Sequence, residues 1–424
     1  MNRSYSRRLM KVFTTTLITI SSISTASAIT VEIEFLGDSF FSQDAQAVAA
    51  INAAAQHVGD AITSTLAPID QVNFTNTVGN TTATLDWSFQ FLDRFTNEPV
   101  GDFPVNVSNP NLASDVVRVF IDAQPLDGNS VGLGVPAGAR ADLGASILGP
   151  GPLNTNAIQS VVGLADTEMN RGGGGALIDT LFDGGETIEG EDIDSIRFRT
   201  SFGGVAFDND TDDNDQPDTA QQLEEFWHLD HTTTVDPGEI DLFSVAVSEI
   251  VTALGFGTSA SFEAQASGTN WAGAEVIALL GTGDSVLDPS SPNNILSGTL
   301  STRISDGAVQ EVALDADIQP GERHELTALD LAFLRDIGFE TITAANPTSA
   351  DFNNDGDIDG VDFLVWQQGG SPNPLSADDL ALWQAAFGNP SASVSAVPEP
   401  CSTLLLVSSL IACDCLRRTR NLTI

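Results

Sequence analysis

The chain has 424 residues, enough for two or three domains of about 150 residues each, and its 42% apolar content is too high for a disordered acidic chain. Seven of its 16 basic residues lie in the terminal segments, which leaves nine arginines and no lysine against all 58 acidic residues between positions 29 and 416. This negative charge repels phosphate backbones and anionic headgroups, so the composition argues against nucleic-acid binding and makes cations the expected partners.

The N-terminal segment has the organisation of a secretory signal peptide. Basic residues up to Lys11 precede an uncharged run from Val12 to about Ser24. Ala26-Ser27-Ala28 then has the small-x-small form that a signal peptidase recognises. We therefore expect signal peptidase to remove residues 1–28 by cutting after Ala28, and the remainder of the chain to be exported.

The main body, residues 29–345, alternates between strand and helix patterns. Ile29–Phe35 alternates like a strand, and the alanine-rich segment from Gln43 to about Leu66 has apolar residues at helical spacing. Val116–Ile121 and Ile196–Phe202 also have the composition of strands. This order predicts a layered α+β or α/β domain, and we take α+β as the fold class.

An acidic stretch within the body has the spacing of a compact calcium loop. Oxygen-bearing side chains stand at loop positions 1, 3, 5 and 9, which are occupied by Asp210, Asp212, Asn214 and Asp218. Asp215 stands where such a loop requires glycine. Both a calcium site and a solvated acidic loop are therefore consistent with this sequence.

A buried helix is predicted over Asp241–Leu254, followed by Gly255 as its stop signal. Apolar residues cover most of its circumference. In its second half the only polar side chains are those of Ser248, Glu249 and Thr252. A carboxylate that faces a core is costly unless it is paired or used in chemistry, so Glu249 is the residue of interest.

The spacing on this helix is that of H-E-x-x-H, in which two histidines bind zinc and the glutamate between them acts as general base. Glu249 stands at the base position, and Gly255 extends the pattern towards H-E-x-x-H-x-x-G-x-x-H. Together with Ala253–Gly257 and the closing segment Leu326–Phe339, this pattern resembles the metzincin-like domains of exported bacterial metallopeptidases that carry sorting tails. The resemblance implies a layered metzincin-like fold for the main body.

The zinc ligands of that family are absent from this chain. Ser248, Thr252 and Thr258 occupy the three ligand positions, and hydroxyl groups are poor zinc ligands. All three methionines precede the helix, so the methionine that lies beneath the zinc in metzincins has no counterpart. We therefore predict an inactive pseudopeptidase without zinc and without catalytic residues, in which Glu249 is a vestigial base.

A second calcium loop is predicted between the main body and the C-terminal tail. Oxygen-bearing residues stand at loop positions 1, 3, 5, 7, 9 and 12, with glycine at position 6 and an apolar residue at position 8, as in an EF-hand. The predicted ligands of one Ca²⁺ ion are Asp351, Asn353, Asp355, Asp357, Asp359 and Asp362. A helix containing Phe363, Leu364 and Trp366 should follow.

This loop-and-helix unit is partly repeated, because Asp379–Gln384 matches Asp362–Gln367 seventeen residues earlier almost position for position. A duplicated unit of this kind resembles a type I dockerin, a small helical module that binds calcium and docks to a cohesin domain. The resemblance covers residues 346–390. The second loop retains only Asp379 of its acidic positions, so we expect one calcium ion, and a cohesin-like partner is an implication of the resemblance alone.

The C-terminal tail, residues 391–424, resembles the PEP-CTERM sorting signal. Pro398-Glu399-Pro400 is followed by the apolar stretch Cys401–Cys413 and then by the basic cluster Arg417–Arg420. In that family the tail holds the exported protein at the membrane, basic end inside, until an exosortase-type protease cuts near the triplet. The uncharged run of 13 residues is shorter than the about 20 that span a bilayer, which favours transient anchoring.

Three interpretations of the whole chain follow from these features. The first is an exported cell-surface or extracellular pseudopeptidase that works by binding. The second is a divergent zinc peptidase that uses Glu249 with other ligands. In the loop Trp227–His231, His228 and His231 are close enough in sequence to share a metal, but two histidines in a loop with Asp230 are also typical of surface polar residues. The third is a structural protein of the extracellular matrix.

Overall fold

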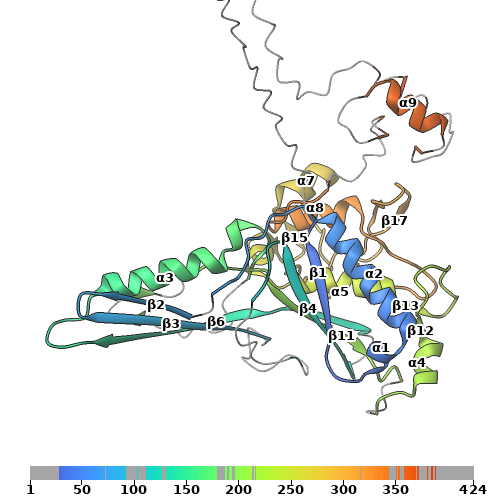
Figure 1. The fold of residues 1–424 in the computed structure, drawn as a ribbon. Coiled ribbons are helices and arrows are strands. Elements are labelled where there is room, and N and C mark those ends of the chain that lie inside the picture. Colours follow the sequence, from blue (N-terminus) through green and yellow to red (C-terminus); the bar gives the residue numbers. More distant parts are fainter. Residues whose placement is uncertain are drawn as a thin grey trace, which may run out of the picture. The chain divides into compact units, whose positions relative to one another are not determined.

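The computed structural model describes residues 28–71, 73–91, 103, 111–126, 130–178, 187–188, 191–192, 196–212, 214, 216–315, 317–342, 350, 352–353, 358–368, 370–371, 380, 383–384 and 387. The fold combines helices with several sheets, consistent with the predicted α+β class (Figure 1). Its contacts divide the chain into unit 1, residues 1–296, 316–323 and 332–342, and unit 2, residues 297–315, 324–331 and 343–424.

Unit 1 contains a sheet with the strand order β1–β4–β11–β5 (Figure 1). Strands β1 (Thr30–Phe35), β4 (Val116–Gln124) and β11 (Phe202–Asp208) are parallel, and β5 (Gly132–Pro136) is antiparallel to β11. Every residue of β11 is buried, as expected for a parallel strand that is covered on both faces. Because β1, β4 and β11 run in the same direction, their carboxyl ends lie at one end of this central sheet.

Two helices pack on the central sheet and on each other. Helix α2 (Ala45–Ala61) contacts β1, and helix α5 (Leu242–Ala253) contacts β5 and β11. The predicted strand β1 and the predicted helix α2 are confirmed, but the expected end of α2 at Leu66 is wrong. Ile62 adopts an extended conformation and forms a β-bridge with Thr341, which ends the helix early.

A second sheet in unit 1 is antiparallel and has the strand order β2–β3–β6. Helix α3 (Thr155–Met169) packs on β2 and β3. Phe89 of β3 contacts Phe202 of β11, with ring centroids 4.5 Å apart, so one hydrophobic core joins the two sheets. The bounds of the strands are Asn73–Val78 (β2), Thr81–Gln90 (β3) and Gly138–Ile147 (β6).

Short elements connect these larger ones. The expected strand Ile196–Phe202 is two separate strands, because the chain leaves one sheet at Arg199 and enters the central sheet at Phe202. The remaining elements of unit 1 are α1 (Phe40–Gln43), η1 (Arg171–Gly173), β7 (Leu177–Ile178), β8 (Thr187–Ile188), β9 (Glu191–Asp192), β10 (Phe198–Arg199), α4 (Ala220–Phe226), β12 (Trp227–His228), β13 (Ile240–Asp241), α6 (Ala260–Glu263), β14 (Ala266–Ser267), β15 (Asn270–Trp271) and α7 (Ala274–Leu280).

Unit 2 contains the antiparallel pair β16 (Leu300–Thr302) and β17 (Val309–Glu311) and the helix α9 (Gly360–Gln367). Helix α8 (Ala328–Asp336) confirms the predicted closing helix, and its first turn belongs to this unit. Helix α9 begins where the sequence predicts a helix after the calcium loop.

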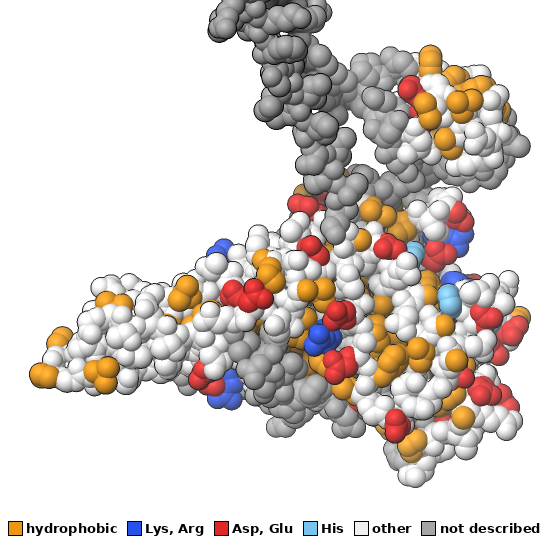
Figure 2. Space-filling view, in the orientation of Figure 1, with side chains coloured by type: hydrophobic (Ala, Val, Ile, Leu, Met, Phe, Trp, Pro, Cys, Tyr) orange, Lys and Arg blue, Asp and Glu red, His pale blue; other side chains and the backbone are white. Residues whose placement is uncertain are grey.

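Figure 2 shows acidic side chains spread over the visible face with few basic ones among them, in line with the composition.

Candidate functional site

Helix α5 carries the segment that resembles a degenerate zinc motif, and the helix is buried as predicted. Asp241 is its N-cap, and Gly255, with φ of 118°, follows its last turn. Within the helix only Glu249 and Thr252 retain partial exposure. These two residues are three positions apart and therefore share one face of the helix.

Strand β5 allows α5 to approach closely because it has glycine at alternate positions. A Cβ atom at Gly134 would clash with the main-chain oxygen of Glu249, and one at Gly132 would lie 2.7 Å from Cγ of Glu249. Leu133 and Val135, which point to the opposite face of the strand, pack against the core of the second sheet. The Glu249 side chain therefore lies directly against the backbone of the edge strand.

The environment of Glu249 favours the protonated carboxyl group. Burial raises its pKa to about 7, and a hydrogen bond from the main-chain N–H of Gly134 opposes part of this rise. None of the ion pairs among the described residues involves Glu249. Glu249 is therefore accommodated through a raised pKa and not through an ion pair with a described arginine.

The three residues at the positions of the family's zinc ligands, Ser248, Thr252 and Thr258, do not form a metal site with Glu249 in the described part of the chain. The hydroxyl of Thr252 donates to the main-chain oxygen of Ser248 at 3.1 Å, within the helix. Oγ1 of Thr258 is buried and has no hydrogen-bond partner in the described part of the chain. Among those same residues, no cluster of three His, Cys, Asp or Glu ligand atoms includes Glu249.

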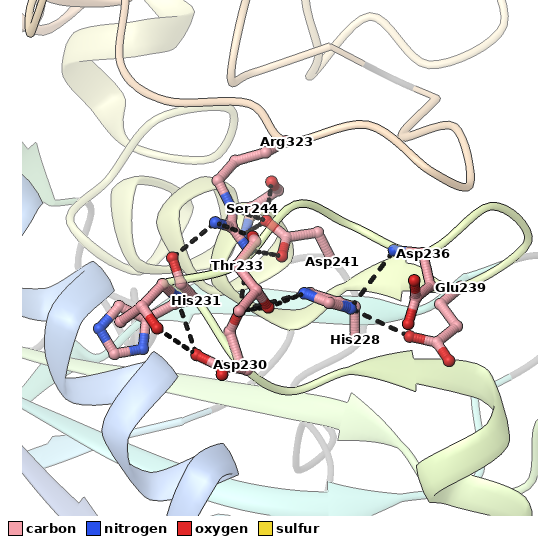
Figure 3. Close-up of polar contacts among 10 residues, drawn as sticks. His228, Asp230, His231, Thr233, Asp236, Glu239, Asp241, Ser244 and Arg323 are labelled. Atoms are coloured by element: carbon pink, nitrogen blue, oxygen red, sulfur yellow. Dashed lines mark hydrogen bonds and ion pairs between the residues drawn. The ribbon is translucent and has the colours of Figure 1, made fainter.

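The two histidines of the loop after β12 do not converge (Figure 3). Nδ1 of His228 lies 3.0 Å from Oε2 of Glu239, and its Nε2 lies 3.0 Å from the main-chain oxygen of Asp230. The ring of His231 points away from His228 and stacks on Phe243, with centroids 6.3 Å apart and an interplanar angle of 18°. The histidine pair considered in the sequence is therefore not a metal-binding pair in this structure.

His228 instead clusters with two acidic residues that the sequence analysis did not consider. Its ligand atoms and those of Asp236 and Glu239 lie within 4.8 Å of one another. Both ring nitrogens already contact protein groups, since the N–H of Asp236 lies 3.4 Å from Nδ1 and Oγ1 of Thr233 lies 3.2 Å from Nε2. A metal would have to displace these contacts, so the cluster acts here as a structural hydrogen-bond network.

Arg323 fixes this loop to the start of α5 (Figure 3). Its guanidinium group donates from Nε and Nη2 to the two carboxylate oxygens of Asp241, at 3.0 and 2.7 Å. Nη1 donates to the main-chain oxygen of Thr233 at 2.9 Å. Asp241 is completely buried and also accepts a hydrogen bond from the N–H of Ser244 at 3.1 Å. This pairing had no signal in the sequence, because its partners are far apart along the chain.

The predicted calcium loop in unit 2 is only partly described, because three of its predicted ligands lie outside the described residues: Asp351, Asp355 and Asp357. Asp362, at the last loop position, is fully buried. Its Oδ1 accepts hydrogen bonds from the N–H groups of Phe352 (2.7 Å) and Asn353 (3.2 Å), so the two ends of the loop lie together. Asp359 caps α9 by accepting a hydrogen bond from the N–H of Val361 at 2.7 Å.

The acidic loop in unit 1 brings together three of its four predicted ligands. Ligand atoms of Asp210, Asp212 and Asp218 lie within 4.8 Å of one another. The fourth, Asn214, donates its main-chain N–H to Oδ1 of Asp210 at 3.1 Å. Three carboxylates of this loop are therefore close enough together to contact a single cation.

The predicted processing sites lie at or beyond the limits of the described chain. Ala28 is the first described residue, and Pro398, Glu399 and Pro400 are outside it. In the part of the chain that is described, no helix is long and apolar enough to cross a membrane. Comparisons of the chain with protein-family models, curated proteins and solved structures gave no match.

Proposed function

We propose that this chain is an exported, non-catalytic relative of metzincin-like peptidases that binds an extended polypeptide segment without cleaving it. The observation that carries the proposal is the arrangement of α5. Glu249 occupies the place of the general base and lies against an edge strand, whereas Ser248, Thr252 and Thr258 offer only hydroxyl groups where the zinc ligands would be. Hydroxyl groups at these positions would not hold the zinc ion that activates water in metallopeptidases.

Strand β5 supports a polypeptide as the ligand. It is the edge strand of the central sheet, and among the described residues it pairs only with β11. Edge strands have unpaired N–H and C=O groups along one side, and these groups can bind an extended peptide as an additional strand. Gly132, Leu133 and Val135 retain partial exposure, so this strand is within reach of a ligand.

Export, calcium and the tail complete the proposal. Signal peptidase would release the chain after Ala28, and an exosortase-type protease would cut near Pro398–Pro400 after transient membrane anchoring. Residues 346–390 would form a dockerin-like module with one Ca²⁺ ion and a cohesin-like partner. Mass spectrometry of the native mature protein should find it to end near Pro400, and recovery of Cys401–Ile424 would contradict the tail assignment.

The peptidase relationship can be tested by restoring the metal ligands. The triple variant Ser248→His, Thr252→His, Thr258→His places three imidazoles at the family spacing, and it should acquire about one zinc ion per chain. The matched alanine variant at the same three positions should acquire none. A folded histidine variant that takes up no zinc would remove the basis for the metzincin-like assignment.

The pKa of Glu249 favours a second candidate, a divergent metallopeptidase. A carboxyl group with a pKa of about 7 can exchange protons at neutral pH, as a general base must. Metal analysis and a casein-cleavage assay of the wild-type protein separate the two functions. Zinc near one ion per chain together with cleavage that is lost in Glu249→Gln would establish the enzyme, and absence of both supports the binding protein.

A further inference from the structure

A cavity lies at the carboxyl end of the central sheet. It has a volume of about 380 Å³, and its lining includes Leu36, Asp38, Asp122, Asn209, Asp218 and Leu223. Leu36, Asp38, Asp122 and Asn209 end or closely follow the three parallel strands β1, β4 and β11. Asp218 closes the loop after β11, and Leu223 lies in α4. In open sheets with parallel strands, ligands bind outside the carboxyl ends of the strands.

The loop after β11 folds back on itself and forms one wall of this cavity. The N–H of Asp218 donates to the main-chain oxygen of Asn209 at 2.7 Å, which brings the end of the loop beside its start. Asp210 is only 3% exposed, and its carboxylate lies close to those of Asp212 and Asp218. None of the ion pairs within the described chain involves Asp210 or Asp218.

Two oxygen atoms in the cavity wall are buried without a donor. Oδ2 of Asp218 accepts hydrogen bonds from the N–H (2.8 Å) and the hydroxyl (2.6 Å) of Thr211, which fixes the orientation of the carboxylate. Its Oδ1 is buried and has no hydrogen-bond partner among the described residues, and the same holds for Oδ1 of Asn209. A buried acceptor without a donor lowers the stability of the fold, and it does so more strongly when it is charged.

We propose that this end of the sheet binds a divalent cation of the calcium type through the carboxylates of Asp210, Asp212 and Asp218. A cation supplies the positive charge that the cluster lacks, and it gives Oδ1 of Asp218 the partner that no donor among the described residues provides. Calcium prefers such carboxylate oxygens, and the absence of His and Cys from the cluster argues against zinc.

The ion would hold the loop in the conformation that forms the cavity wall, because its ligands come from both ends of the loop. The proposed ligands belong neither to the predicted loop 351–362 nor to strand β5. The proposal can therefore be tested independently of the proposed function.

The test uses the full chain with Asp351→Ala and Asp362→Ala, which remove the predicted loop in unit 2. Calorimetric titration with CaCl₂ should then detect one remaining ion per chain. Adding Asp210→Asn and Asp218→Asn should weaken this binding at least tenfold. Adding Asp60→Asn and Asp284→Asn instead removes the same charge from exposed positions outside the cluster and should leave the binding unchanged.

A folded Asp351→Ala, Asp362→Ala variant that binds no calcium at about 5 mM overturns the proposal, and so does equal binding by the Asp210→Asn, Asp218→Asn variant. If the variant with Asp210→Asn and Asp218→Asn does not fold, hydrogen exchange of the wild-type protein provides the test instead. Calcium should slow amide exchange in residues 208–218 at least tenfold. Unchanged exchange in this loop on addition of calcium also overturns the proposal.

Discussion

Helix α5 has one carboxyl group at its start, that of Asp241, and one in its second half, that of Glu249, and the two groups have contrasting environments. Asp241 is completely buried, and it accepts hydrogen bonds from Nε and Nη2 of Arg323 and from the N–H of Ser244. Glu249 has no cation partner among the described residues, and its pKa is raised to about 7. A structural role therefore accounts for Asp241, whereas Glu249 lowers stability at neutral and alkaline pH.

The largest effect is expected at the paired end of the helix. Arg323→Ala leaves Asp241 as an uncompensated buried charge, and it should lower the free energy of unfolding by about 3–5 kcal/mol. Urea denaturation measures this loss. Arg335→Ala is the control, because its ion pair with the exposed Glu275 should contribute about 0–1 kcal/mol.

If Arg323→Ala does not fold, the double variant Arg323→Met, Asp241→Asn provides the test. It removes both charges together and should recover much of the lost stability, because no unpaired charge remains. Equal destabilisation by the single variant and its Arg335 control would show that the pair is not a principal contributor to stability.

The second effect concerns Glu249 and depends on pH. Since its folded pKa of about 7 lies above the ordinary value of 4.5, the stability associated with the protonated group is fully present below about pH 4.5 and is lost as the pH rises through 7. The shift corresponds to on the order of 3 kcal/mol. Glu249→Gln removes this loss, so the variant should exceed the wild type in stability by that amount near pH 9.

Urea denaturation at several pH values checks this prediction, with the exposed Glu263→Gln as the matched control. The difference between Glu249→Gln and the wild type should grow from about zero near pH 4 to its full value above pH 8. A constant difference across this range would mean that Glu249 has an unseen partner or an ordinary environment.

The smallest effect concerns the strand that Glu249 contacts. In Gly134→Ala the new Cβ would collide with the main-chain oxygen of Glu249, and such overpacking costs about 1–3 kcal/mol. Gly163→Ala in α3 is the control, and it should raise the stability instead of lowering it. A Cβ there meets no atom within 4 Å, and alanine is favoured in a helix by up to about 1 kcal/mol. Thermal unfolding of the two variants measures both shifts, and an unchanged Tm in Gly134→Ala would contradict the close contact.

Local sequence patterns were sufficient to predict β1, β4, α2 and α5, because their apolar periodicity is strong. They were insufficient for β5, since Gly132-Leu133-Gly134-Val135-Pro136 has low strand propensity. Its signal was the alternation of glycine, which indicates a close approach by another element but does not say which one. The second sheet was also missed, and its strands owe their conformation to pairing with one another.

At the candidate site too, local sequence patterns predicted the helix but not the contacts between distant segments. The position of Glu249 on a buried helix follows from the helix pattern, but its close contact with a strand more than a hundred residues earlier in the chain does not. The pairing of Asp241 with Arg323 likewise joins segments 82 residues apart. Conversely, His228 and His231 are neighbours in sequence but diverge in space, because Phe243 and Glu239 provide separate contacts for their rings.

The alternation of glycine with larger residues along β5 also has a consequence for which peptides the strand could select. One face of the strand consists of glycines beneath α5, and the side chains of the other face, Leu133 and Val135, are directed into the core. Neither face therefore presents side-chain pockets to a bound segment. A ligand added to this edge would be recognised through its main chain, so binding should depend on its ability to extend and only weakly on its amino-acid sequence.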